Sequence, residues 1–150
     1  GGHLAAIVAQ RVPGLRAQVL VYPCCDLRPD HLARMPHPEG YALDRAAIEF
    51  FVSSSLGGAD VHDPLVSPLA ASRDVLATVP PACVVTAEYD PLRDDGRRYA
   101  EALGQSGVHV EELRYDDQMH LFFSLPELLE GARSAIEGCA AFLSRQLATT

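Results

Sequence analysis

Two side chains have the types and positions needed for acid–base chemistry at one edge of a sheet. Asp90 follows the apolar run Ala82–Ala87 and stands just before a helix start, and His120 lies between an alternating segment and the last helical segment. A carboxylate can orient an imidazole, and an oriented imidazole can accept a proton from a nucleophile. Catalytic groups of open α/β sheets gather at the carboxyl ends of the strands. We therefore expect Asp90 and His120 to lie close together.

Each residue also has a simpler interpretation. Asp90 is placed to cap the helix that follows, an interaction that contributes about 1 kcal/mol. A single loop histidine is more often a surface or hydrogen-bonded residue than a general base. Asp94 and Asp95 fall in the first turn of the same helix, where the helix dipole favours anions, so they need no catalytic explanation. Only the pairing of Asp90 with His120 favours catalysis.

The elements that must position these residues alternate between helix and strand. Apolar periodicity and Gly/Pro stop signals predict helices over 3–11, 44–56, 92–106 and 126–147, and strands over 18–22, 82–87 and 108–115. The first helix of the four has no evident beginning. Val108, Val110 and Leu113 are expected to face inward from the last strand, which should lie near an edge. This alternation predicts a doubly wound α/β fold with a mostly parallel sheet.

The sheet is small, and the segments around its first strand are incomplete or irregular. Residues 26–40 and 59–81 lack apolar periodicity and are expected to be loops. The strand over 18–22 has the composition of a strand buried on both faces, although no expected strand precedes it. We therefore expect an open edge on that strand and a remainder of the sheet outside this chain.

Composition argues against several functional classes. The 150 residues carry a net charge of −8, and the 12 basic residues are scattered arginines, which disfavours nucleic acid as a partner. No apolar run approaches the roughly 20 residues that span a bilayer, so no membrane partner is expected. Cysteines at 24, 25, 83 and 139 lack the spacing of a zinc or redox motif. We expect reduced, buried thiols, a cytoplasmic protein, and neither metal nor cofactor. A soft-metal site of His3, Cys24 and Cys25 is disfavoured, because free cysteine packs as a small hydrophobic residue.

Five ordered motifs carry a family resemblance. The segments are Gly1–Ala6, Val21–Pro23, Asp63–Leu69, Ala87–Gly96 and Met119–Phe123. They resemble, in order, the helix after the nucleophile elbow, the next strand, the Asp-Pro-x-x-Ser-Pro-Leu segment, the acid motif and the histidine motif of the hormone-sensitive-lipase-like (family IV) carboxylesterases. The order acid then histidine, with an earlier serine, is also that of the α/β-hydrolase superfamily.

The resemblance implies roles for single residues. It makes Asp90 the triad acid and His120 the triad base, and it places the serine just before Gly1 and the oxyanion segment further upstream. Residues 1–150 would then be the C-terminal part of an α/β-hydrolase domain, with 26–56 contributing to a cap. Gln118 and Leu121 depart from the family, which often has glycine at both positions.

Three hypotheses follow. The first is serine-dependent hydrolysis of short-chain carboxylic esters, in which a complementary N-terminal half supplies the serine and this chain alone is inactive. The second is a non-catalytic, hydrolase-like binding module. The third is an interaction protein whose open strand edge at 18–22 pairs with a complementary half or with a second copy of the chain. A homo-oligomer is therefore one of the alternatives. The serines at 53–55, 67, 72 and 124 do not stand in a Gly-x-Ser-x-Gly elbow, and Cys24 follows the wrong strand for a nucleophile.

Overall fold

A three-stranded parallel sheet forms the centre of the molecule. The computed structural model describes residues 1–32, 35 and 40–148. The sheet has the order β1-β2-β3, with β1 at Gln18–Val21, β2 at Ala82–Tyr89 and β3 at Val110–Met119. Both pairings are parallel, and Gln18 lies opposite Ala82, which lies opposite Val110. The predicted α/β class with parallel strands is confirmed.

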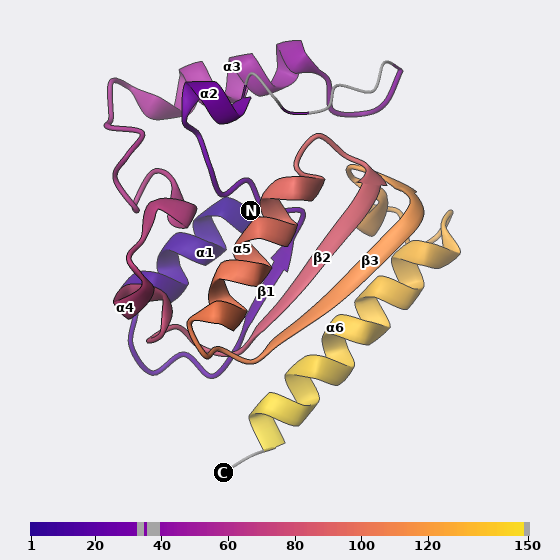
Figure 1. Cartoon of the computed structure of the whole chain (residues 1–150). Helices are drawn as coiled ribbons and strands as arrows, with labels where there is room; N and C mark the ends of the chain where they lie inside the picture. The colour runs from indigo at the N-terminus through magenta and orange to yellow at the C-terminus, as the bar shows by residue number, and fades with distance from the viewer. Residues whose placement is uncertain (33–34, 36–39, 149–150) are drawn as a thin grey trace.

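Helices cover both faces of the sheet (Figure 1). On one face lie α1 (Gly2–Arg11) and α5 (Arg93–Gln105), and on the other lies α6 (Glu130–Ala148). Successive residues of β2 point to opposite faces, so Val84 packs against the α1 and α5 side, whereas Cys83 and Val85 pack against the α6 side. Burial on both faces explains why β2 is apolar throughout.

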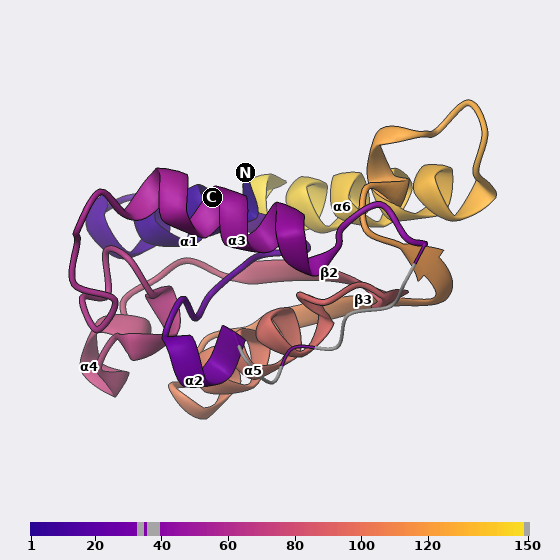
Figure 2. The same cartoon turned by 90° about the horizontal axis from the view of Figure 1, so that it is seen from above.

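The segment between β1 and β2 crosses the end of the sheet at which the strands finish. It contains α2 (Pro29–Leu32), α3 (Arg45–Leu56), a 3₁₀ turn at Pro68–Ala70 and α4 (Arg73–Leu76). Figures 1 and 2 show α2 and α3 outside the α/β layers, across the carboxyl ends of the strands. Of the expected loop over 26–40, residues 33–34 and 36–39 lie outside the described residues.

Local signals explain where α3 begins and ends. Asp44 accepts a hydrogen bond from the amide of Ala47 at 2.8 Å, and Gly57 ends the helix with φ 49° in the left-handed region. Only Ile48 of this helix is buried. It joins a small apolar cluster with Leu43 and with Leu92 at the start of α5, which is the apolar attachment of α3 to the core.

The third strand is longer than predicted and is buried differently. It continues to Met119, because pairing with β2 resumes at Tyr89–Met119 after an irregularity in the register. The expectation that Val110 and Leu113 share an inward face is wrong. Val110 packs on the α5 side and Leu113 on the α6 side, since residues three apart on a strand point to opposite faces.

Two further expectations are corrected. The last helix begins at Glu130 rather than around Pro126, because turns over 125–129 precede it. Short helices occupy parts of the predicted loops, and Ser72 caps α4 by accepting from the amide of Val75. The expected open edge is observed, because within the described residues β1 pairs with β2 alone. No helix in the described part of the chain is long and apolar enough to cross a membrane.

Candidate active site

Asp90 and His120 meet at the carboxyl edge of the sheet. Asp90 directly follows β2 and His120 directly follows β3, and these strands are neighbours. The imidazole Nδ1 lies 2.8 Å from Oδ2 of Asp90, whose side chain is fully buried, whereas 15% of the His120 side chain is exposed. An ionised carboxylate at this distance holds the proton on Nδ1 and leaves Nε2 free to accept one.

Asp90 serves the helix and the histidine with different oxygens. Its Oδ1 accepts a hydrogen bond from the amide of Leu92 at 2.8 Å, and its carbonyl accepts from the amide of Arg93 at 3.0 Å. The capping interpretation of Asp90 is wrong in detail, because Leu92 is the N-cap of α5 and Asp90 instead closes the turn before it. This turn does not compete with the pairing to His120, since it uses the other carboxylate oxygen. The turn fixes the carboxylate, and a fixed carboxylate fixes the imidazole.

Two strained residues hold the imidazole from other sides. Among the described residues other than glycine, Tyr22 (φ 34°) and Leu121 (φ 75°) alone have positive φ. The ring centroid of Tyr22 lies 4.4 Å from that of His120, and Leu121 follows His120 in sequence. Strained backbone of this kind is concentrated at functional sites. Leu121 keeps a left-handed conformation where the family often has glycine, so its departure from the motif is accommodated at the cost of strain.

Two adjoining cavities open beside His120. One of about 240 Å³ lies between α3 and the core and is lined mainly by apolar side chains: Leu27, Leu43, Ile48, Phe51, Val52 and Leu92. The other, of about 400 Å³, extends past Tyr22 and Leu121. Gly1 and His120 line both cavities. The first residue of the chain and the imidazole therefore border the same two cavities.

The start of α1 approaches β1 very closely. A Cβ on Gly2 would lie 2.8 Å from the carbonyl oxygen of Val21, so only glycine fits there without a shift. His3 is held by a 2.8 Å hydrogen bond between its Nε2 and the carbonyl oxygen of Val66.

The described residues contain no group of three His, Cys, Asp or Glu side chains that could hold a metal ion.

The cysteine at the cavity wall is poorly suited to attack a substrate. Cys24 lines both cavities. Burial raises the pKa of the Cys24 thiol far above its ordinary value, and the nearby Asp95 carboxylate adds to the rise. Because the thiolate is the nucleophilic form, this environment argues against a cysteine nucleophile.

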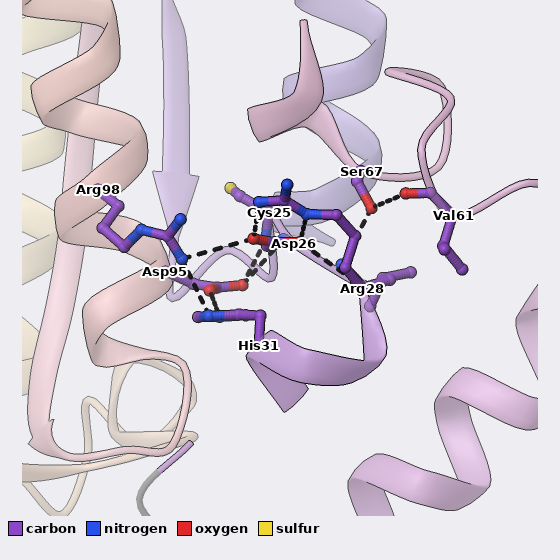
Figure 3. Close-up of polar contacts among 9 residues, drawn as sticks. Cys25, Asp26, Arg28, His31, Val61, Ser67, Asp95 and Arg98 are labelled. Carbon is purple, nitrogen blue, oxygen red and sulfur yellow. Dashed lines mark hydrogen bonds and ion pairs between the residues drawn. The ribbon is translucent and has the colours of Figure 1, made fainter. Parts of the chain in front are cut away.

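Asp95 is a residue whose importance the sequence reasoning missed. Its carboxylate is fully buried and accepts hydrogen bonds from the amides of Cys25 at 2.7 Å and Asp26 at 3.1 Å (Figure 3). It also contacts Nε2 of His31, on α2. Helical spacing contained the signal, because Asp95 lies three residues after Leu92 and four before Tyr99, which are both buried.

A second buried carboxylate lies beside Asp95. Asp26 accepts from Arg28 through both oxygens, at 2.7 and 2.6 Å, and Arg98 approaches it at 3.4 Å (Figure 3). Burial acts to raise the pKa of Asp26, but the hydrogen bonds from Arg28 outweigh burial and hold the pKa below its ordinary value. Asp26 is therefore ionised, and the loop after β1 is tied to α5 through charged groups.

The next turn of this loop is fixed by a hydroxyl group. Ser67 Oγ accepts from the amide of Leu27 at 3.0 Å and donates to the carbonyl oxygen of Val61 at 2.7 Å (Figure 3). Ser67 is fully buried, so its structural reading holds and it has no access to the cavities. The motif around Ser67 thus secures the loop that lines the site.

Fold and site together define an α/β protein with an Asp–His pair at the carboxyl ends of adjacent parallel strands, next to an apolar cavity. A family model described as alpha/beta hydrolase fold matches residues 1–124. The chain belongs to this family, and the resemblance to the hormone-sensitive-lipase-like esterases is confirmed by relatives that are esterases by name.

Three of these relatives illustrate the match. Carboxylesterase NlhH of Mycobacterium tuberculosis is 33% identical over 154 residues, with 98% of this chain and 48% of that protein covered. An arylesterase of Saccharolobus solfataricus is 39% identical over 132 residues, covering 84% of this chain and 42% of the arylesterase. A solved esterase from the archaeon Pyrobaculum calidifontis superposes with a TM-score of 0.83 at 34% identity, covering 94% of this chain and 48% of the esterase. The chain spans about half the length of the curated relatives it matches.

Proposed function

We propose that this chain supplies the acid and the base of a Ser-His-Asp triad that hydrolyses short-chain carboxylic esters. Asp90 is the acid and His120 is the base, and the nucleophilic serine belongs to the part of the complete protein that precedes Gly1. The observation that carries the proposal is the position of His120, held by a buried carboxylate and lining the same cavities as Gly1. The shared cavities support a nucleophile just upstream of Gly1.

The reaction follows from this geometry. Nε2 of His120 takes the proton of the serine hydroxyl as its oxygen attacks the ester carbonyl carbon. The imidazolium, stabilised by Asp90, then gives that proton to the departing alcohol and leaves an acyl-enzyme. Water attacks the acyl carbon, passes its proton to His120, and the acid product leaves as the serine regains its proton.

The cavity supports a small, apolar acyl group. Its volume of about 240 Å³ lies just below the range typical of small-molecule sites, and its walls are mainly hydrophobic. In this proposal residues 26–56 act as the cap, because α3 carries Ile48, Phe51 and Val52 onto the cavity opposite Leu92. Relatives named carboxylesterase and arylesterase support ester substrates in general.

The cysteines support a reducing, cytoplasmic location. All four are free thiols, and Cys25, Cys83 and Cys139 are buried. Buried free cysteines pack as small hydrophobic residues and need no oxidising environment. Thiol titration of the unfolded, unreduced protein should return every cysteine of this segment as a thiol, whereas a disulfide would contradict the location.

A fluorophosphonate probe tests the proposed function directly. In the complete protein we expect one labelled serine, located by peptide mass spectrometry upstream of Gly1, and loss of p-nitrophenyl acetate hydrolysis on labelling. His120→Gln should slow labelling by several orders of magnitude because the serine loses its base. Labelling at an unchanged rate in that variant, or of no serine in the active parent, would contradict the triad.

A further inference from the structure

The molecule contains a second carboxylate–imidazole pair, and it joins the α2–α3 segment to the core. His31 lies on α2 and Asp95 in the first turn of α5. The side chain of Asp95 is fully buried and 15% of the His31 side chain is exposed. We propose that Asp95 and His31 form a clasp that positions the α2–α3 segment, and with it the wall of the substrate cavity.

The first argument is the number of groups that Asp95 organises. Its Oδ2 satisfies the amides of Cys25 and Asp26, directly downstream of β1, while its Oδ1 contacts Nε2 of His31 (Figure 3). Buried amides without a partner are costly, so this carboxylate sets the path of the chain from β1 to α2. Cys24 and Leu27 lie on that path and line the apolar cavity of about 240 Å³.

The second argument is how little else anchors the segment. Most of α3 is exposed, and its one buried residue, Ile48, reaches the core through the small cluster that includes Leu92. A segment with few buried contacts opens at low free-energy cost. A charge-assisted hydrogen bond to a buried carboxylate therefore has a large influence on how often α2 and α3 leave the cavity.

The third argument is the arrangement of charge around His31. Arg98 donates to Nδ1 of His31 at 2.9 Å, and the same Nη1 lies 3.4 Å from Oδ2 of Asp26. With Nδ1 as acceptor, the Nε2 proton of a neutral imidazole points to Asp95. When Nδ1 is protonated, Arg98 has Asp26 as its alternative partner, so the contact with Asp95 persists in both charge states of His31.

The clasp rests on the proposed function only for its catalytic consequence. His31 and Asp95 touch no substrate atom in the mechanism above, so they are positioning residues. Loss of the clasp loosens a cavity wall and leaves the Asp90–His120 pair intact. The expected signature is a higher KM with an unchanged kcat, most clearly for an ester whose acyl chain reaches α3.

Trypsin reports on the clasp without any catalysis. The chain has no lysine, so trypsin cleaves only after arginine, and Arg45 is the exposed first residue of α3. In the complete protein, His31→Ala should raise the rate of cleavage after Arg45 about tenfold, the cost expected for one hydrogen bond to a charged group. His31→Gln keeps an N–H donor toward Asp95 and should stay near the parent rate.

A matched control is provided by His109. Its Nε2 lies 3.3 Å from Glu111 in a pair that is exposed, with 60% of the His109 side chain accessible. Surface pairs contribute little, so His109→Ala should leave both cleavage after Arg45 and KM unchanged. The same variants are assayed with p-nitrophenyl hexanoate, for which His31→Ala should raise KM about tenfold and leave kcat within about twofold.

The outcomes separate the clasp from the proposed function. Faster cleavage and higher KM in His31→Ala, with recovery in His31→Gln, support the clasp. Cleavage and KM both at parent values overturn it, and faster cleavage with unchanged KM overturns its role at the cavity. If the parent hydrolyses no ester, the proposed function fails while cleavage after Arg45 still decides the clasp.

An experiment on the unmodified protein covers the case in which His31→Ala does not fold. The amides of Cys25 and Asp26 should exchange with deuterium as slowly as those of β2, because both donate to the buried carboxylate. Exchange at the rate of exposed amides would overturn the clasp.

Discussion

The first turn of α5 and the residues before it hold two imidazoles, and the two pairs differ in what surrounds them. Asp90 binds His120 beside two cavities, and the part of the chain that the structure describes offers no partner to the other imidazole nitrogen. Asp95 binds His31 beneath α2, with the other nitrogen bonded to Arg98. In the proposed function, identical side-chain types thus serve as a base in one place and as a tether in the other. The difference between the two pairs is whether the second ring nitrogen has a hydrogen-bond partner, as it does in His31 with Arg98.

Of the two carboxylates, Asp90 is expected to have the larger effect on turnover. Asp90→Asn preserves the shape of the side chain and removes the charge that holds the tautomer of His120, so kcat for p-nitrophenyl acetate should fall on the order of 10⁴-fold. The urea midpoint should move little, because the amide oxygen can still accept from Leu92. A large loss of stability with near-normal turnover of the folded fraction would reduce Asp90 to a role in the turn before α5.

Asp95 should show the opposite balance. Asp95→Ala leaves the amides of Cys25 and Asp26 and the imidazole of His31 without their common acceptor. Removing one member of a buried charged network costs about 3–5 kcal/mol. Urea unfolding should register that loss, and a change under about 1 kcal/mol would contradict the clasp.

The pH dependence of stability should identify His31. The hydrogen bond with Asp95 raises the pKa of His31 above its ordinary 6.5, against the opposing effects of burial and Arg98. The groups around His31 are Asp26, Arg28, Asp30, Asp94, Asp95 and Arg98. A raised pKa in the folded state means that the added stability is complete below pH 6.5 and is lost as pH rises through the folded pKa.

A comparison with His31→Gln isolates this contribution. The difference in unfolding free energy between parent and variant should shrink as pH rises above 6.5, and an NMR titration should show His31 titrating above that value. A difference that grows with pH would contradict the assigned sign.

The smallest effect is expected at Leu121. Leu121→Gly removes the left-handed strain at φ 75° from a side chain that is 46% exposed, and it should stabilise the protein by about 1 kcal/mol. Thermal unfolding measures the change. Leu113→Gly on β3 is the matched control, and it should destabilise, because Leu113 packs against the core on the α6 side.

Sequence patterns predicted the parts of the molecule governed by periodicity. The buried run of β2, the cap at Asp44 and the stop at Gly57 are readable because each rests on a local rule. The extension of β3 to Met119 is set by pairing with β2, which no local pattern of Asp116 and Asp117 reveals. The start of α6 was misjudged for a similar reason, since turns before Glu130 replace the first helical turn that Pro126 suggested.

The candidate site was also predictable only where local position in the sequence indicates a role. Asp90 and His120 were found from their positions after strands, and their roles stay proposals. The sequence identifies Tyr22 only as a strand end, because its contact with His120 depends on the alignment of β1 and β3 across β2. The sequence favoured only a helix-dipole role for Asp95, since its partners Cys25, Asp26 and His31 come from the loop after β1 and from α2, far away in sequence.

The central claim is that one imidazole of the two is the base, and kcat of two alanine variants tests it most directly. In the complete protein, at saturating p-nitrophenyl acetate, His120→Ala should lose on the order of 10⁵-fold in kcat, whereas His31→Ala should stay within about twofold of the parent. Turnover retained in His120→Ala, or an equal loss in both variants, would contradict the assignment of base and tether.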